Sequence, residues 1–219
     1  MAADSPSLSG PLPEAHLHGP LAAAQPPLGL RERKKLKTRI AIRRATYRLI
    51  GEQGYEATTV EQIAEAAEVS PSTVFRYFPT KEDIVLTDEY DPFMETALRA
   101  RPAGEEPLES LRLVMKQAVA ALLEHEPEEM RQRARLMAEV PAVRARMSET
   151  MAETSQLLSR VLADRTGRAV DDLEVRVFTA AVMGALREVT IHWAERDRQD
   201  DLVALVDRAI DTLKGGPSL

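Results

Sequence analysis

The stretch VSPSTVFRYFPTKED, residues 69–83, decides how the rest of this sequence is interpreted. It places three aromatic residues, Phe75, Tyr77 and Phe78, within four positions of a chain that is only 4% aromatic. A buried strand would use rings at this density, and so would a very short helix held against a surface. The residues at the two ends of the stretch distinguish between these structures.

The ends of the stretch favour the short helix. Ser70 is a preferred N-cap residue, and Pro71 suits the first helical position because its missing N–H would have no helical partner there. Pro79 disfavours helical backbone at the residue before it, so the helix has to stop there. The stretch therefore predicts a helix of two turns over residues 71–77.

The helical period gives this short helix two faces. Val74 and Phe78 fall on one side and are expected to face the core, and Phe75 is expected to help Phe78 anchor the helix. The other side is polar and is expected to point outward. It carries Ser72, Thr73, Arg76 and Tyr77.

Helices are predicted on both sides of this element. The preceding basic segment has an apolar stripe at helical spacing and ends at Gly54, which is expected to be a left-handed cap. The next helix begins with a capping box of Thr58 and Glu61, and its alanines allow a neighbouring helix to approach closely. Thr80 and Asp83 predict a second capping box, which starts a further helix.

Charge is distributed unevenly along the chain. The net charge is −6, yet the segment 31–48 holds nine Lys or Arg residues and a single acid, Glu32. A local basic block on an acidic protein indicates a surface that faces a polyanion. The plainer interpretation of such a block is a solvated helix face.

The composition excludes several classes of protein. The chain has no cysteine, which rules out disulfides, thiolate metal sites and cysteine nucleophiles. No apolar run reaches the ~18 residues of a membrane span, and the N-terminus lacks the pattern of a signal peptide, so a cytoplasmic protein is expected. Clustered histidines, metal-ligand spacing and phosphate-cradling glycine loops are missing from the sequence, so neither an enzyme, a cofactor nor a metal is expected.

Three regions are predicted from composition and periodicity. Residues 1–30 are rich in proline and alanine and are expected to form a disordered tail. Residues 31–80 form a small helical domain and residues 81–219 a larger one, so the fold class is all-α with about nine helices. In the larger domain, helices are predicted over 81–101 with an interruption at Asp91-Pro92, and then over 107–125, 128–140, 141–165, 171–197 and 201–214.

The two short helices within residues 58–77, preceded by a basic helix, predict a helix-turn-helix in a three-helix bundle. Small polar residues on the second helix let it enter the major groove of DNA. The segment GYEATTVEQIAEAAEVSPSTVFRYFPTKEDIV, residues 54–85, resembles the DNA-binding segment of the tetracycline-repressor (TetR) family of bacterial regulators. The resemblance covers residues 36–85. It implies an N-terminal DNA-binding domain followed by a helical domain that dimerises and binds a small molecule.

The resemblance also implies roles for individual residues. The candidates for reading bases are Pro71, Ser72, Thr73 and Arg76. The candidates for contacting the DNA backbone are Thr59, Tyr77 and Lys81, together with Arg43 of the basic helix. The plainer alternatives are a packing aromatic for Tyr77 and a solvated surface arginine for Arg76. Ser72 stands where the family often has glycine, a departure expected to alter base preference and not the fold.

The helix over 171–197 is apolar on two faces, so it requires a partner beyond its own bundle. Together with 201–214 it resembles the four-helix dimer interface of the family, and Gly184 permits close approach. The predicted interface residues are Val182, Ala185, Val189, Trp193, Leu202, Leu205 and Val206. A two-fold dimer places two recognition helices one or more DNA turns apart, at ~34 Å per turn, and so predicts a palindromic operator.

Methionines in the larger domain predict an adaptable apolar pocket, with plain core filling as the alternative. The predicted pocket residues are Met115, Met137, Met147, Met151, Phe178 and Met183. This domain is also similar to that of actinobacterial mycofactocin-type regulators, some of which sense acyl thioesters, and the similarity implies an apolar or acylated effector. The predicted function is a DNA-binding transcriptional repressor that a small-molecule effector releases from its operator. The alternative is a DNA-binding dimer without an effector, controlled by its concentration or by a protein partner.

Overall fold

Ten helices and no strand make up the part of the chain that the computed structural model describes, residues 29–87, 91–196 and 200–216. In chain order they are α1 (Leu30–Gln53), α2 (Val60–Ala66), α3 (Pro71–Tyr77), α4 (Lys81–Leu86), α5 (Asp91–Arg99), α6 (Pro107–His125), α7 (Pro127–Glu139), α8 (Pro141–Thr166), α9 (Leu173–Glu195) and α10 (Leu202–Gly215). The all-α prediction is confirmed. The described residues give ten helices where about nine were predicted, since the predicted helix 81–101 is divided into α4 and α5. The predicted tail, apart from its last two residues, lies outside the described residues.

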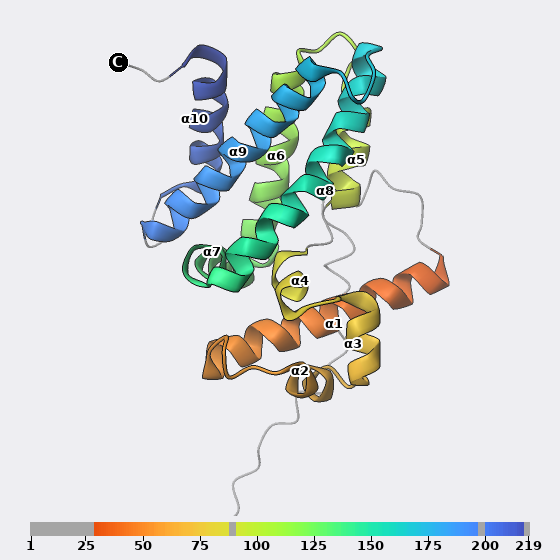
Figure 1. The fold of residues 1–219 in the computed structure, drawn as a ribbon, viewed down its shortest axis with the longest axis vertical. Helices are drawn as coiled ribbons and strands as arrows, with labels where there is room; N and C mark the ends of the chain where they lie inside the picture. Colours follow the sequence, from red (N-terminus) through yellow and green to blue (C-terminus); the bar gives the residue numbers. More distant parts are fainter. Residues whose placement is uncertain (1–28, 88–90, 197–199, 217–219) are drawn as a thin grey trace, which may run out of the picture.

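The helices form two parts that are stacked along the long axis of the molecule (Figure 1). The lower unit consists of α1, α2 and α3, and the upper bundle consists of α5 to α10. In the upper bundle α9 packs against α7, α8 and α10. Helix α4 lies where the two parts meet and contacts α1, α7 and α8.

The core of the lower unit confirms the predicted inner face of the short helix α3. Val74 and Phe78 are each 1% exposed, and they pack with Ile42 of α1 and Ile63 of α2. The turn between α2 and α3 passes through Glu68, whose φ of 56° is left-handed. Because this turn is so short, α2 and α3 cross closely and leave the opposite face of α3 open to solvent.

Two helix starts, those of α3 and α4, are capped as predicted. Ser70 Oγ accepts a hydrogen bond of 3.2 Å from the backbone N–H of Thr73 at the start of α3. Thr80 and Asp83 form the predicted capping box of α4. Gly167 closes α8 with a left-handed φ of 68°, a conformation that glycine adopts without steric cost. These caps depend on residues within a few positions of one another.

The start of α2 differs from the predicted pattern by one residue. Its capping box consists of Thr59 and Gln62, not of Thr58 and Glu61. Thr58 is buried, and its hydroxyl donates a hydrogen bond of 2.8 Å to the carbonyl of Gly54, so it belongs to the preceding turn. Gly54 has the predicted positive φ, 88°, but its ψ of 163° is extended and not left-handed helical.

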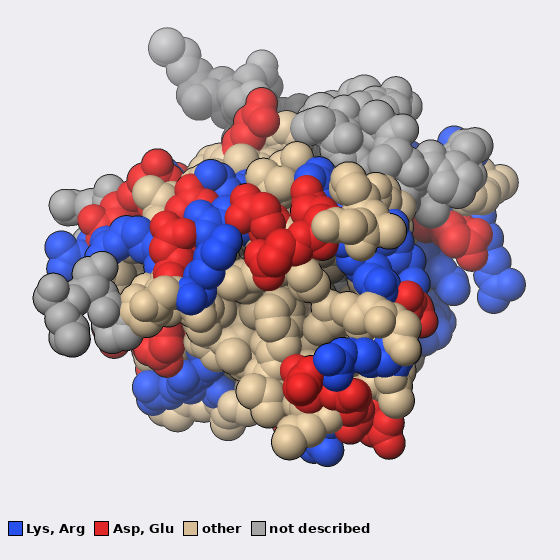
Figure 2. Space-filling model, turned by 90° about the horizontal axis from the view of Figure 1, so that it is seen from above, with Lys and Arg blue, Asp and Glu red and all other residues tan. Residues whose placement is uncertain are grey.

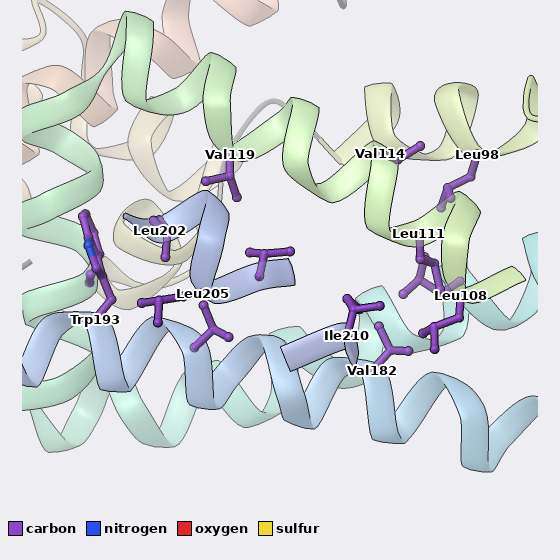
Figure 3. Close-up of a cluster of buried hydrophobic side chains, with 14 of the residues drawn as sticks. Leu98, Leu108, Leu111, Val114, Val119, Val182, Trp193, Leu202, Leu205 and Ile210 are labelled. Carbon is purple, nitrogen blue, oxygen red and sulfur yellow. The ribbon is translucent and has the colours of Figure 1, made fainter. Parts of the chain in front are cut away.

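The core of the upper bundle uses most of the residues that were predicted to form the dimer interface. Figure 3 shows Trp193 of α9 near Leu202 of α10, and Val182 of α9 near Ile210 of α10, in a cluster that α6 completes. Six of the seven predicted interface residues are buried in this cluster: Val182, Val189, Trp193, Leu202, Leu205 and Val206. Packing within one protomer already buries these six side chains, which argues against their part in a dimer interface. Ala185, the seventh, is partly buried.

A second buried cluster joins the lower unit to the upper bundle, and we call it the junction cluster. Tyr47 and Ile50 of α1 pack in it against Val85 of α4 and against Val143 and Met147 of α8. The Tyr47 hydroxyl also donates a hydrogen bond of 2.9 Å to the carbonyl of Val85. Since closely packed cores transmit displacements, a movement of α4 or α8 is passed on to α1.

None of the described helices is both long and apolar enough to cross a membrane. The same residues contain no group of three or more histidines or carboxylates that would hold a metal ion.

Candidate nucleic-acid interface and ligand cavity

The N-terminal end of α3 presents a cluster of hydroxyl groups. Ser70 Oγ lies 2.9 Å from Ser72 Oγ and 2.9 Å from Thr73 Oγ1. Each hydroxyl is both a donor and an acceptor and rotates to suit its partner. Pro71 and Ser72 are exposed beside them. This end of α3 is narrow and polar, which suits entry into a major groove of ~12 Å width.

The outer face of α3 includes an aromatic ring that the sequence analysis placed inside. Phe75 is 51% exposed, and the anchoring role expected of it is filled by Val74 and Phe78. Residues three or four positions apart share a helix face, so Phe75 lies with Ser72 and Arg76. The helical period alone did not settle this, because Phe75 is three residues from exposed Ser72 and also three residues from buried Phe78. An exposed ring on a groove-entering helix suits contact with a thymine methyl group.

Arg76 and Tyr77 end α3 on its outer side. The Arg76 guanidinium lies 5.4 Å from the centre of the Tyr77 ring, and its Nη2 lies 3.4 Å from Thr73 Oγ1. These weak contacts leave the donor fork of Arg76 exposed, and such a fork matches the acceptor edge of guanine. Tyr77 is half-buried and packs against the core of the lower unit. Its ring therefore packs as the alternative interpretation expected, while part of the side chain stays accessible.

Lys81 is held by the turn that precedes α2. Its Nζ donates hydrogen bonds of 2.8 Å to the carbonyl of Tyr55 and 2.9 Å to the carbonyl of Thr58, and lies 3.9 Å from the centre of the Tyr55 ring. An ammonium group has three N–H donors, so one is left over for a phosphate. Thr59, the exposed N-cap of α2, lies one residue beyond this turn. Lys81 thus has a structural role whatever its part in DNA binding.

Tyr55 adds a second link between the same turn and α4. Its hydroxyl donates a hydrogen bond to the carboxylate of Glu82. Burial raises the pKa of the Tyr55 hydroxyl, and the bond to Glu82 raises it further. The phenol therefore stays protonated at neutral pH and keeps donating, so this link does not vary with pH in that range.

Arg43 does not belong to the nucleic-acid surface. It is 3% exposed, and its guanidinium donates to Glu126 at 2.7 Å and to Glu129 at 3.1 Å. Burial raises the pKa of the Glu129 carboxyl above its ordinary value, Arg43 opposes this, and Glu126 adds to it. The prediction that Arg43 contacts DNA is wrong, because the side chain points toward the upper bundle and links α1 to α7.

The first half of α1 carries most of the basic block. Its exposed cations are Arg31, Arg33, Lys34, Lys35 and Lys37. None of these five forms an ion pair with another described residue. Seen from the end opposite the lower unit, by contrast, basic and acidic side chains are interspersed (Figure 2). The concentrated positive charge therefore lies on the lower unit, where it attracts a polyanion.

The upper bundle contains a cavity of about 140 Å³. Its volume is close to that of an engineered cavity of ~150 Å³ that binds benzene. Four methionines, an arginine and a threonine are among the described residues that line it: Met94, Met115, Met130, Met137, Arg133 and Thr190. Because methionine is flexible, this lining can rearrange around a larger ligand.

Two of the six predicted pocket residues, Met115 and Met137, line this cavity. The other four do not line this cavity, because tertiary packing places them elsewhere. Met147 and Met151 belong to the junction cluster or pack against it, Phe178 lines a separate small cavity between α6, α8 and α9, and Met183 packs against the upper core. Met94, Met130 and Arg133 also line the cavity, and no local signal in the sequence indicates this.

One face of α9 is left uncovered. Leu173 and Val177 are 73% and 58% exposed, and Ala181 and Gly184 continue the same face at helical spacing. A methyl group added at Gly184 would meet no other atom within 4 Å, so the backbone is accessible there. Exposed apolar residues beside small ones suit close packing against a helix of another chain. The predicted interface residues do not include Leu173, Val177 or Ala181, although Gly184 was predicted to permit close approach.

A helix-turn-helix unit with an open recognition helix, joined through α4 to a bundle with an internal cavity, defines a DNA-binding transcriptional regulator. Residues 42–87 match the family described as bacterial regulatory proteins, tetR family, and residues 105–217 match the MftR C-terminal domain. The chain belongs to the tetR family. The resemblance noted in the sequence is confirmed for both parts of the chain.

Several known regulators are similar to this chain over most of its length. It is 36% identical over 197 residues to the HTH-type transcriptional regulator TcmR of Streptomyces glaucescens. The matched region covers 85% of this chain and 87% of TcmR. It is 24% identical over 180 residues to the fatty acid metabolism regulator protein of Bacillus subtilis, and this match covers 78% of this chain and 91% of that protein. Among solved structures, FadR of Thermus thermophilus in complex with lauroyl-CoA has a TM-score of 0.54 and 25% identity, with 83% and 95% covered.

Proposed function

We propose that the protein is a homodimeric repressor that binds a palindromic operator and leaves it when a mainly apolar effector enters the cavity of the upper bundle. The observation that carries this proposal is the position of α7. On one side α7 lines the cavity with Met130 and Met137. From the same helix, Gln132 Nε2 donates a hydrogen bond of 3.0 Å to the Tyr47 carbonyl of α1. A ligand that shifts α7 would therefore shift the lower unit.

We assign base contacts to the outer face of α3 and backbone contacts to the groups around it. The base-reading candidates are Pro71, Ser72, Thr73, Phe75 and Arg76. The phosphate-contacting candidates are Thr59, Tyr77 and Lys81. The basic half of α1 adds attraction that does not depend on sequence. Because DNA is the partner, we place the protein in the cytoplasm.

We assign dimerisation to the uncovered face of α9, from Leu173 to Gly184. A two-fold axis through this face would pair the upper bundles of two protomers and leave both lower units free. The two α3 helices would then meet successive major grooves one or more turns apart, at ~34 Å per turn. In this arrangement residues 31–80 serve as the DNA-binding domain and residues 81–219 as the effector-binding and dimerisation domain.

The effector class follows from the cavity lining and is supported by one relative. The lining is apolar and rich in methionine, which favours an apolar or acylated ligand. FadR of Thermus thermophilus, 25% identical to this chain, has been solved with lauroyl-CoA. The present cavity is smaller than the ~300 Å³ of a usual ligand pocket, so the methionines must repack to admit such a chain.

Release follows if the effector favours a conformation in which the lower units are wrongly spaced for the operator. The junction cluster and the Arg43 ion pairs connect α1 to α4, α7 and α8. A displaced α7 would therefore turn α1, and with it α3, relative to the two-fold axis.

The test is DNA binding by the purified protein to the sequences that flank its own gene, across a salt series. We expect saturable binding to one palindrome. Arg76→Ala should lower the preference for this site over unrelated DNA by about 1–3 kcal/mol. Tyr77→Phe, which removes one hydroxyl, should weaken all sequences alike. Arg160→Ala, on the exposed side of α8, is the control and should change neither quantity. Equal affinity of the parent for every sequence would refute the groove-reading assignment.

The small volume of the cavity favours one alternative, a DNA-binding dimer without an effector. Thermal unfolding with a panel of apolar and acylated compounds separates the two functions. At least one compound should raise the unfolding midpoint and release the operator. If every compound leaves both unchanged while the operator is bound specifically, regulation by concentration or by a protein partner takes the place of our proposal.

A further inference from the structure

Arg133 lies between the ligand cavity and the junction with the lower unit. Its side chain is the charged group among the described residues that line the cavity. Its Nη2 also donates a hydrogen bond to the carbonyl of Leu86, the last residue of α4. One guanidinium therefore reaches both the ligand site and the helix that follows the helix-turn-helix.

The wall between these two regions is thin. A much smaller cavity, of about 10 Å³, lies on the side of α1 and is lined by Arg43, Tyr47 and Glu129. Leu122, Met130 and Arg133 line both cavities. The ligand cavity is thus separated from the Arg43 ion pairs by single side chains. Two of these side chains, Met130 and Arg133, belong to α7.

The chemistry of the arginine favours a particular kind of ligand. A guanidinium remains charged at every physiological pH, and its hydrogen bonds to an anion are about twice as strong as those to a neutral acceptor. The Leu86 carbonyl is a neutral acceptor. Arg133 also has an interaction besides its bond to Leu86, so an anionic group that arrives in the cavity would compete with the carbonyl and with that partner for the guanidinium.

We propose that Arg133 binds an anionic head group of the effector, and that this contact draws the guanidinium away from the Leu86 carbonyl and frees the end of α4. The methionines of the cavity hold the apolar tail. The inference rests on the proposed function, because it assumes an effector in this cavity. It adds the charge of the head group and names Arg133 as the positioning residue through which occupancy reaches α4.

The test compares two probes that differ in charge and share an alkyl chain, octanoate and octan-1-ol. Shorter and longer pairs of six to ten carbons accompany them, because the cavity limits chain length. Each probe is titrated into the full-length protein on its operator, and release is followed by fluorescence anisotropy. Calorimetry without DNA measures probe binding separately.

Two substitutions at Arg133 and one matched control complete the design. Arg133→Gln removes the charge, Arg133→Lys keeps it without the planar fork, and Arg135→Gln removes an exposed charge two positions along the same helix. Circular dichroism and the thermal midpoint verify that each variant is folded. Since α7 stays helical with any of these side chains, a folded Arg133→Lys protein keeps the test decisive if Arg133→Gln does not fold.

In the parent, octanoate should release the operator at a concentration at least tenfold below that of octan-1-ol. Arg133→Gln should need at least tenfold more octanoate with no change for octan-1-ol, Arg133→Lys should fall between, and Arg135→Gln should match the parent. Without any probe, Arg133→Gln should bind the operator more weakly than Arg135→Gln, since α4 has lost a hydrogen bond.

Different outcomes overturn the inference and the proposed function. If octanoate and octan-1-ol act alike in the parent, or if Arg133→Gln responds to octanoate as the parent does, the role of Arg133 is refuted and the repressor remains. If the operator is bound but no acid or alcohol of any length binds or releases it, the effector cavity itself is refuted. If no operator is bound, the proposed function fails before the probes are added.

Discussion

The substitution Arg43→Met tests how the lower unit is attached to the upper bundle. Arg43 lies 2.7 Å from Glu126 and 3.1 Å from Glu129, and all three side chains are largely removed from water. Methionine keeps much of the packing of the arginine stem but leaves two carboxylates facing each other without the guanidinium that donates to both. Removing one partner from a buried ion pair costs about 3–5 kcal/mol. We expect the lower end, about 3 kcal/mol, because Glu129 retains some contact with solvent.

Urea unfolding measures this loss. The protein concentration is held constant, because the stability of a dimer depends on it. The free energy of unfolding falls by ~3 kcal/mol per molar urea. A loss of about 3 kcal/mol therefore lowers the urea midpoint of unfolding by ~1 M. The triple variant Arg43→Met, Glu126→Gln, Glu129→Gln should regain most of this midpoint, because no uncompensated charge is left.

Two results would refute this reasoning. If Arg43→Met unfolds within ~0.2 M of the parent, or if the triple variant is no more stable than the single one, the ion pairs do not join the two parts. The same variant tests the correction to the sequence prediction. The slope of the logarithm of its operator affinity against the logarithm of salt concentration, the salt slope, should equal that of the parent. A slope smaller in magnitude by ~0.9 would mean that Arg43 neutralises a phosphate after all.

Three further predictions follow from the geometry. The raised pKa of Glu129 means that its favourable contribution to stability is present below the ordinary value of 4.5 and is lost as pH rises through the folded-state pKa. The parent should therefore lose stability relative to Glu129→Gln as pH rises from 4 to 7, and constant spacing of their urea midpoints would count against this. Replacement of Lys34, Lys35 and Lys37 by Gln should reduce the salt slope of DNA binding by up to ~2.7, and an unchanged slope would mean that this part of α1 stays clear of DNA. Val177→Asp, on the uncovered face of α9, should yield monomers in sedimentation; a dimer of unchanged affinity would move the interface elsewhere.

The sequence by itself determined the helix-turn-helix and most of the helix boundaries. Ser70 before Pro71 and the Thr80–Asp83 capping box act within one helical turn, so they form in any context that permits a helix. The inner face of α3 follows from the same short-range period. The candidate base-reading residues could therefore be named in advance, apart from Phe75, whose exposure runs against its hydrophobic character.

The tertiary structure decided which helix faces are shared and with what. Arg43 belongs to a basic run whose sequence predicts an exposed surface. Its burial depends on two glutamates more than 80 residues away. α9 is apolar around much of its circumference, and the position of α6 determined that Val182 and Trp193 fill the core and that Leu173 is left exposed. The cavity likewise gathers residues from α5, α6, α7, α9 and α10. Local sequence specifies a helix through contacts between near neighbours, whereas partners and cavities arise from contacts between distant segments, which helical periodicity does not encode.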